Sequence, residues 1–192
     1  MNVIKKIETF TNLRNLSKMN SHNDGTRTIF ESVIYPEIIA ALGDWIRNSE
    51  DNYVLLGGVA LSYYVKPRTT TDIDVLFLHE EDIPSQIKLF KKHRTGAFLH
   101  KKTNVEVEVL TPEFIKIPFK VAKAIFDTSE IKDGIRIASP SGLVASKLFR
   151  FSRQDQADIE SLLLCQNIDL AKLYIPKSEW DKYYTIKNDL HK

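Results

Sequence analysis

Residues 53–78 read YVLLGGVALSYYVKPRTTTDIDVLFL, and the rest of this 192-residue chain is best interpreted around them. Residues 53–56 form a short apolar run that ends at a glycine pair, which is typical of a buried strand. Residues 59–65 are compatible with about two turns of helix. Pro67 disfavours continuation of that helix, because the residue before a proline avoids the α region. The stretch therefore predicts a strand, a glycine turn, a short helix, a loop and a second strand.

The second strand begins with two acidic residues, Asp72 and Asp74. Residues two apart in a strand project from the same face, so the two carboxylates are expected side by side. Like charges this close repel unless a cation lies between them, and Mg²⁺ commonly binds one or two protein carboxylates together with substrate phosphates. Backbone N–H groups at Gly57 and Gly58 offer a place for those phosphates, because no side chain blocks their approach. The pattern predicts a magnesium-dependent phosphate site.

These residues resemble a known family. The nucleotidyltransferase superfamily that includes polymerase β carries Gly-Gly or Gly-Ser at a strand-to-helix turn, followed by Asp-x-Asp on the next strand. More narrowly, residues 57–76, GGVALSYYVKPRTTTDIDVL, are similar to the AbiEii-type branch, whose small bacterial and phage-borne enzymes include toxins of toxin–antitoxin and phage-defence systems. The resemblance implies two Mg²⁺ ions, or Mn²⁺ in their place, held by the acidic pair. It also implies that the triphosphate of an NTP is bound by Gly57, Gly58 and Arg68.

Residues 105–110, VEVEVL, supply the candidates for a third carboxylate. Strict alternation predicts a strand with its valines on one face and Glu106 and Glu108 on the other. A half-exposed strand with a polar outer face is one interpretation. The other follows from the resemblance, which implies a third acid on a neighbouring strand that binds metal and activates the attacking hydroxyl. Glu108, followed by VLTP, matches the family's frame best, with glutamate in place of the more usual aspartate and with Glu106 as a competitor.

Residues 139–163, SPSGLVASKLFRFSRQDQADIESLL, resemble the same branch a second time. The branch carries Lys-Leu, then basic residues, then Lys-Asp and a second Asp three positions later. The resemblance implies that these positions order the site, with Lys147 and Asp155 binding the nucleotide. Without the resemblance, Lys147 and Asp155 are equally well explained by a salt bridge between packed helices. Gln154 stands where lysine is usual, and the matching residues are Lys147, Leu148, Arg150, Arg153, Asp155 and Asp158.

Composition places the chain among ordinary globular proteins. Hydrophobic residues make up 43% and charged residues 27% of the sequence, so global disorder is not expected. The 27 basic and 25 acidic residues leave a formal charge of +2, which gives no strong electrostatic footprint for nucleic acid. The single cysteine, Cys165, excludes an intramolecular disulfide framework, and its setting in a leucine run predicts an inert buried thiol. No apolar run approaches the ~20 residues that span a bilayer and no signal peptide is recognised, so a cytoplasmic location is expected.

The two ends of the chain are less informative. Residues 4–16 have apolar residues at a spacing compatible with an amphipathic helix. Residues 29–46 predict a helix that Pro36 kinks or restarts. In residues 169–192, aromatic residues are interleaved with lysines, which favours helix packing over stacking on single-stranded nucleic acid.

Residues 80–93 predict a further helix, with apolar residues on one face. Lys88, Lys91 and Lys92 lie on the other face, which is either solvated or in contact with a polynucleotide. Ser139-Pro140 is a favourable start for another helix, because serine caps a helix well and proline suits its first position.

Together these patterns predict an α/β (α+β) fold of the nucleotidyltransferase type, with a small mixed sheet flanked by helices. We divide the chain into an undecided N-terminal segment (residues 1–27), a nucleotidyltransferase core (28–138) and a C-terminal helical part that closes the cleft (139–192). The resemblance implies transfer of a nucleoside monophosphate from an NTP to the hydroxyl of an acceptor, namely an RNA or tRNA 3′ end, a small molecule or a protein. A toxin of this kind would have a cognate antitoxin as partner. The alternative is a non-catalytic nucleotide-binding or antitoxin-like protein that retains the fold.

Overall fold

The computed structural model describes residues 34–50, 52–66, 69–132 and 134–190. Within these ranges, helices cover a seven-stranded mixed sheet with the strand order β3-β4-β5-β2-β1-β7-β6. The strands are β1 (Val54–Leu55), β2 (Asp72–Leu76), β3 (Phe90–Arg94), β4 (Ala97–His100), β5 (Glu106–Leu110), β6 (Glu130–Lys132) and β7 (Ile135–Ile137). The helices are α2 (Pro36–Asn48), α3 (Gly57–Leu61), α4 (Phe119–Asp127), α5 (Pro140–Arg150), α6 (Arg153–Cys165) and α7 (Lys177–Asp189), with 3₁₀ turns η1 (Glu80–Asp82) and η2 (Ala171–Leu173). The predicted mixed sheet with flanking helices is confirmed.

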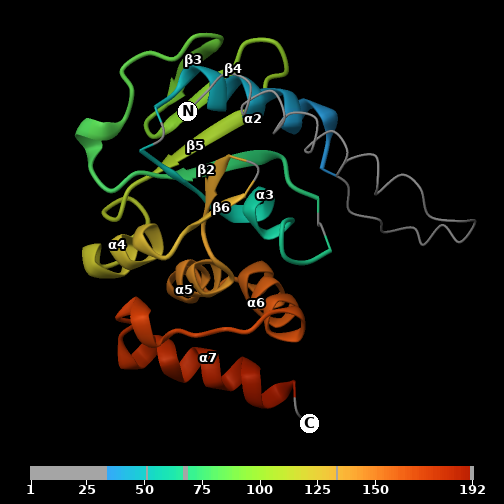
Figure 1. The fold of residues 1–192 in the computed structure, drawn as a ribbon, viewed down its shortest axis with the longest axis vertical. Helices are drawn as coiled ribbons and strands as arrows, with labels where there is room; N and C mark the ends of the chain where they lie inside the picture. The colour runs from blue at the N-terminus through green and yellow to red at the C-terminus, as the bar shows by residue number, and fades with distance from the viewer. Residues whose placement is uncertain (1–33, 51, 67–68, 133, 191–192) are drawn as a thin grey trace, which may run out of the picture.

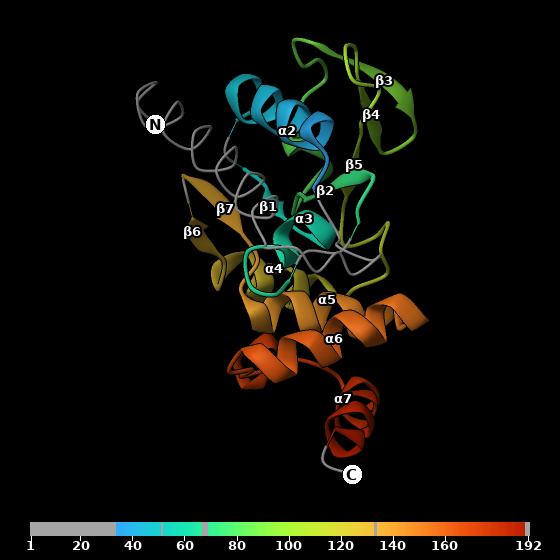
Figure 2. The same ribbon diagram turned by 90° about the vertical axis from the view of Figure 1, so that its right-hand side faces the viewer.

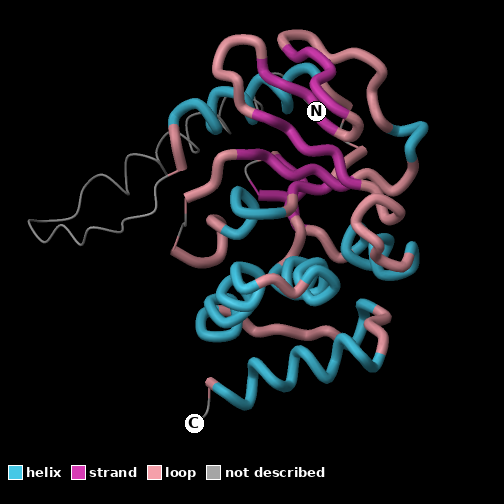
Figure 3. The backbone as a smooth tube through the Cα atoms, turned by 180° about the vertical axis from the view of Figure 1, so that it is seen from behind, coloured by secondary structure: helices cyan, strands magenta, loops and turns pink. Residues whose placement is uncertain are grey.

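Helices lie on both faces of the sheet (Figure 1). α2 lies on one face, and α3, α4 and α5 lie on the other, as the turned view in Figure 2 shows. α6 packs on α5, and α7 contacts both, so the C-terminal helices stack progressively further from the sheet. Seen from behind in Figure 3, the strands form one band above these helices. The core between the layers includes the fully buried Trp45 of α2.

The two central strands carry the acidic residues. β2 pairs in parallel with β5 and antiparallel with β1, while β1 pairs in parallel with β7. In β2, Ile73 and Val75 are buried, whereas Asp72 and Asp74 are half-buried on the opposite face. Because parallel neighbours need a crossover connection, the chain leaves β2, forms β3 and β4, and returns as β5. Acidic residues from two distant segments thus meet in the middle of the sheet.

Local signals account for the helix starts. Pro36 is the first residue of α2, so the helix predicted over residues 29–46 does not run through this proline, and its residues 29–33 lie outside the described residues. Ser139 caps α5 by accepting a hydrogen bond from the backbone amide of Gly142 (3.2 Å), as its sequence predicts. Ser152 caps α6 through a reciprocal capping box with Asp155.

The predicted helix over residues 80–93 is wrong. Only Glu80–Asp82 forms a 3₁₀ turn, and Phe90–Arg94 forms the edge strand β3, which pairs antiparallel with β4. Gly96, with a φ of +74°, lies in the tight turn between these strands, in a conformation that glycine adopts without steric cost. Pairing with β4 therefore outweighs the helical spacing of the apolar residues.

The expectation of a buried Cys165 is also wrong, because this residue is exposed. An α-helix turns by roughly 100° per residue, so four consecutive apolar residues cannot all face the core. Leu162 is fully buried, whereas Leu164 is 71% exposed near the end of α6. The leucine run therefore has one buried side and one solvent side.

The C-terminal helix packs against the body of the protein. Tyr183 is buried in the core and Trp180 packs partly buried against it, so the predicted packing of the tail is confirmed for these residues. The possible amphipathic helix over residues 4–16 lies outside the described residues. None of the described helices has both the length and the hydropathy that a membrane crossing requires.

Candidate active site

Pairing between β2 and β5 sets the positions of the acidic residues. Asp74 lies opposite Glu108, and Asp72 lies opposite Glu106. Side chains alternate along each strand, so these four carboxylates project from one face of the sheet. Asp74 and Glu108 line two cavities together with residues of α5, which identifies that face as the one covered by the C-terminal helices.

The two cavities adjoin each other and differ in character. The larger has a volume of about 410 Å³ and the smaller about 210 Å³. One wall of the larger cavity is apolar, whereas the smaller cavity is lined mainly by hydroxyl, carboxylate and basic groups. The residues common to both are Gly57, Asp74, Glu108, Lys147 and Arg150. The apolar wall consists of Leu110, Phe114, Ile115 and Phe149, and the smaller cavity adds Thr69, Thr70, Thr71 and Asp72.

Gly57 allows Asp74 to occupy the shared wall. Its φ of +62° is a left-handed conformation that residues with a side chain rarely adopt. A Cβ at this position would lie 1.6 Å from Oδ2 of Asp74, far inside a non-bonded contact. The backbone amide of Leu56 also donates to the backbone carbonyl of Asp74 (2.9 Å). The glycine turn and the carboxylate therefore form one unit, and α3 starts at this turn and ends at Leu61, earlier than predicted.

Negative charge accumulates around Asp74. Burial, and then the charges of Asp72 and Glu108, raise the pKa of Asp74 to about 7. The positive charges of Lys147 and Arg150 oppose this rise without cancelling it. The three carboxylates therefore repel each other when all are ionised, and a bound cation would remove that repulsion.

Asp72, Asp74 and Glu108 fit Mg²⁺ in the chemistry of their donor atoms. Hard carboxylate oxygens are its preferred protein ligands, and Mg²⁺ keeps several waters and substrate phosphates in its coordination sphere. Within residues 34–190 and outside the short gaps in that range, no three acidic, histidine or cysteine side chains form a ready-made metal cage. The carboxylates thus suit a cation that arrives with a phosphate ligand rather than one enclosed by protein alone.

Arg94 forms hydrogen bonds with both glutamates of β5. Its guanidinium donates to Glu106 through Nη2 (2.5 Å) and Nε (3.3 Å), and to Glu108 through Nη2 (3.0 Å). The hydrogen bonds from Arg94, followed by its positive charge, lower the pKa of Glu106 against the opposing effect of burial. Ala97 pairs with both Arg94 and Glu108 across the sheet, and its short side chain leaves space for this contact. Glu106 lines neither cavity, so the geometry favours Glu108 as the third carboxylate.

The basic residues of the site are held between α5 and α6. Nζ of Lys147 donates to Oδ2 of Asp158 (2.5 Å) and lies 3.5 Å from Oδ1 of Asp155. Arg150 binds the carboxylate of Asp155 through two hydrogen bonds of 2.7 Å. Gln154 donates to Oδ1 of Asp158 (3.0 Å). Lys147 therefore forms the interhelical salt bridge and also lines both cavities.

The sequence patterns did not single out Arg150 or Arg94 as individual site residues. The side chain of Arg150 is 70% exposed and lines both cavities, and its place one helical turn after Lys147 is a signal that favours it. The role of Arg94 depends on the β3–β4 hairpin, which the sequence did not predict. Arg68, proposed to bind the triphosphate, lies outside the described residues.

Asp155 joins the start of α6 to the cleft. Burial alone would raise the pKa of Asp155, but hydrogen bonds from Arg150 and Ser152, together with the nearby charge of Lys147, lower it to about 2. Its carboxylate accepts from the backbone amide (3.0 Å) and the hydroxyl (2.7 Å) of Ser152. One side chain thus both caps a helix and orients the cavity's arginine.

We expect Asp155→Asn to lower the free energy of unfolding by roughly 2–3 kcal/mol at neutral pH, because a cap and a charge-assisted pair are both weakened. Since the folded-state pKa lies below the ordinary value of 3.8, this stabilisation is present above about pH 4 and is lost as the pH falls toward 2. Urea denaturation from neutral pH down to about pH 3 measures the effect. The matched control is Asp127→Asn, which breaks an exposed pair with Lys123 and should change stability by less than ~0.5 kcal/mol. Equal effects of the two variants would contradict the prediction.

A glycine turn packed against a carboxylate on the central strand of a mixed sheet, with a second carboxylate on the parallel neighbour, defines a nucleotidyltransferase fold. Comparison with family models agrees with this class. Residues 37–191, most of the chain, match the family described as "Nucleotidyltransferase of unknown function (DUF6036)", and the chain belongs to that family. No curated protein matches the chain significantly.

Proposed function

We propose that this protein is a metal-dependent nucleotidyltransferase that moves a nucleoside monophosphate from an NTP to an acceptor hydroxyl. The acceptor oxygen bonds to the α-phosphorus, the bond from that phosphorus to the bridging oxygen of pyrophosphate breaks, and the hydroxyl loses its proton. The observation that carries the proposal is the meeting of Gly57, Asp74 and Glu108 in one wall that two cavities share with Lys147 and Arg150. Carboxylates that could bind a metal ion and basic side chains that could bind phosphates thus face the same space.

Asp72, Asp74 and Glu108 are the residues that would hold the metal. When bound, Mg²⁺, or Mn²⁺ in its place, would stabilise the attacking and leaving oxygens of an in-line displacement. The raised pKa of Asp74 supports this assignment, because a cation would compensate both the burial of its charge and the repulsion from Asp72 and Glu108. Glu108 is proposed to accept the proton of the acceptor hydroxyl. Its contact with Arg94 (3.0 Å) holds it in position for that role.

The nucleotide is proposed to lie across both cavities. The backbone at Gly57 and Gly58 would meet the triphosphate, with Lys147 and Arg150 neutralising its charge. Because Asp155 binds Arg150 through two hydrogen bonds, this arginine is oriented before the nucleotide arrives. The apolar wall of the larger cavity suits the base, and Phe114, 49% exposed, offers it a ring face.

The resemblance to AbiEii-type enzymes supports a role as a toxin of a toxin–antitoxin or phage-defence system. An RNA or tRNA 3′ end, a small molecule and a protein side chain are the acceptors to test, and an antitoxin would be the partner of a toxin. One observation favours a second candidate, a nucleotide-binding or antitoxin-like protein without turnover. Gln154 places no charge where the related enzymes carry lysine, and it bonds to Asp158 instead.

The test is incubation of the purified protein with Mg²⁺ and each α-labelled NTP in turn, with total RNA present and absent. Label on RNA would support the transferase and identify both nucleotide and acceptor class. Label on the protein itself would indicate protein modification. Nucleotide binding without transfer to RNA, protein or a panel of small-molecule hydroxyls would favour the second candidate.

Glu108→Gln is expected to reduce transfer by about 10²-fold, the contribution typical of a positioned proton acceptor. Glu106→Gln is the matched control on the same strand, two residues away and outside both cavities, and should reduce transfer by less than about fivefold. Transfer rates at saturating NTP compare the two variants. A larger loss in Glu106→Gln would exchange the roles assigned to the two glutamates.

A further inference from the structure

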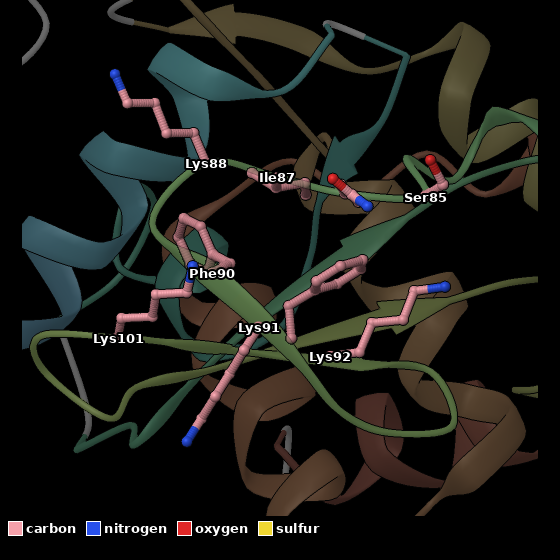
Figure 4. Close-up of a pocket in the computed structure, with 9 residues that line it drawn as sticks. Ser85, Ile87, Lys88, Phe90, Lys91, Lys92 and Lys101 are labelled. Atoms are coloured by element: carbon pink, nitrogen blue, oxygen red, sulfur yellow. The ribbon is translucent and has the colours of Figure 1, made fainter.

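A separate hollow lies away from the two cavities of the candidate site, at the free edge of the sheet. It has a volume of about 690 Å³ and is formed by β3, by the segment before it and by residues of β4 and the following turn. Figure 4 shows Lys88, Lys91, Lys92 and Lys101 spread around it. We call these four residues the edge lysines.

The edge lysines create a strong local charge in a nearly neutral chain. The hollow is lined by four lysines and by no carboxylate. None of the four forms an ion pair with any residue that the structure describes. The whole chain carries a formal charge of only +2, so the positive charge here is concentrated rather than general. Unpaired positive charge of this density attracts an anionic partner.

The floor of the hollow is apolar and closed. Phe90 and Phe98 line it but are each only 4% exposed, so neither ring is available for stacking on a ligand. Contacts with a charged ligand at this place would therefore be made mainly by lysine ammonium groups, with Ser85 and Gln86 as the uncharged polar residues of the lining. Such groups recognise phosphate as point charges, without reading a base sequence.

The arrangement of the edge lysines suits a chain of phosphates rather than a compact anion. Lys91 and Lys92 are neighbours on an edge strand and point to opposite sides of it, while Lys101 reaches toward Phe90 (Figure 4). In Figure 4 the four side chains point in different directions, so their ammonium groups do not converge on one point. Lysines on an edge strand also prevent sheet-to-sheet association. That role does not account for Lys88 and Lys101, which lie outside β3.

We propose that this hollow binds the phosphodiester backbone of single-stranded nucleic acid, laid along the free edge of β3. A duplex presents its phosphates on a stiff convex surface, whereas a flexible single strand can enter a hollow. Binding of this kind is independent of sequence and depends strongly on salt, because each phosphate contact releases condensed counterions. The proposal requires neither NTP nor metal.

The same strand connects the hollow to the candidate site. β3 ends at Arg94, which contacts Glu108 (3.0 Å) in the wall of both cavities. Phe90 and Phe98 contact Trp45 of α2, so the floor of the hollow lies on the opposite face of the sheet from Glu108. A single strand held by the edge lysines would reach the acceptor side of that site by passing around the free edge of β3. Resting on the proposed function, this path makes a polynucleotide hydroxyl the acceptor that the structure favours.

The experiment is fluorescence anisotropy with a labelled single-stranded RNA of mixed sequence, in EDTA and without NTP, over a series of salt concentrations. Lys91→Ala with Lys92→Ala should weaken binding about 25-fold at ~0.1 M salt and make the slope of log K against log salt shallower by about 1.4. Lys88→Ala with Lys101→Ala should act alike, and it leaves the edge strand unaltered. The matched control removes two exposed lysines near α7, Lys172 and Lys177, at the opposite end of the molecule (Figure 1), and should bind as the unaltered protein does.

Three results would overturn the proposal: no RNA binding at low salt, an equal loss in the control, or binding to phosphatidylserine vesicles without binding to RNA. Because the assay contains no nucleotide and no metal, its outcome is separate from that of the transfer assay. RNA binding by a protein that transfers no nucleotide would support this site and refute the proposed function. Nucleotide transfer without RNA binding would support the proposed function and refute the nucleic-acid site.

Discussion

Asp74→Asn is expected to abolish nucleotidyl transfer, by at least about 10³-fold, and at the same time to stabilise the protein. The folded-state pKa of Asp74 is about 7, against an ordinary value of 3.8, so between these values the folded state binds more protons than the unfolded state. Stability therefore falls as the pH rises from about 4 to 7. At about pH 8 without divalent cations, the variant should be roughly 2–4 kcal/mol more stable than the unaltered protein, because it has no charge at this position that is buried and repelled by Asp72 and Glu108. At about pH 4 the two should be alike.

Urea denaturation in EDTA at both pH values, alongside the transfer assay, measures these effects. Asp181→Asn, which neutralises an exposed carboxylate on α7, is the control and should change neither stability nor transfer. Full transfer by Asp74→Asn would remove the metal role assigned to this residue. A stability gain that is equal at both pH values would show that the buried charge of Asp74 is not its cause.

Gly57→Ala should cause the other large loss. Its Cβ would lie 1.6 Å from Oδ2 of Asp74, so the carboxylate must move by more than ~1 Å, and displacement of that size costs more than about 10² in rate. The φ of +62° adds roughly 1–2 kcal/mol of backbone strain to the folded state. We therefore expect lower activity and lower stability together, which transfer assays and thermal denaturation measure.

Gly142→Ala is the control for this substitution. Gly142 is a buried glycine in α5 whose added Cβ would approach Cγ2 of Ile125 at 3.3 Å, a contact that a shift of a few tenths of an ångström relieves. Its backbone is helical, where alanine is favoured over glycine by roughly 1 kcal/mol. Unchanged activity in Gly57→Ala would show that the turn can open without displacing Asp74.

Local patterns predicted the centre of the fold. A few consecutive residues determine each of three features: the glycine turn, the strand that begins at Asp72, and the alternating strand of Glu106 and Glu108. The structure contains all three. The helix cap at Ser139 and the apolar face of the C-terminal helix are local signals too, and both predictions are confirmed. Structural features that depend only on a few consecutive residues could therefore be predicted from the sequence.

Contacts between distant segments were not readable in this way. Residues 80–93 have helical spacing, and only pairing with β4 makes Phe90–Arg94 a strand. The choice between the two glutamates depends on which of them lines the cavities, and those cavities are formed by distant segments. The exposure of Cys165 depends on which side of α6 meets its neighbours. Each of these features is decided by a partner rather than by the segment itself.

The parallel pairing of β2 with β5 also decides when the candidate site can come into existence during folding. Asp74 and Glu108 face each other only after the intervening hairpin has formed and β5 has docked. Contacts of such large sequence separation form late, because loop closure must precede them. A chain that ends after β2 but before Glu108 therefore contains the glycine turn and Asp74 but not the carboxylate that faces Asp74. Copies of the protein that end before β5 thus lack the carboxylate pair on which the proposed function depends.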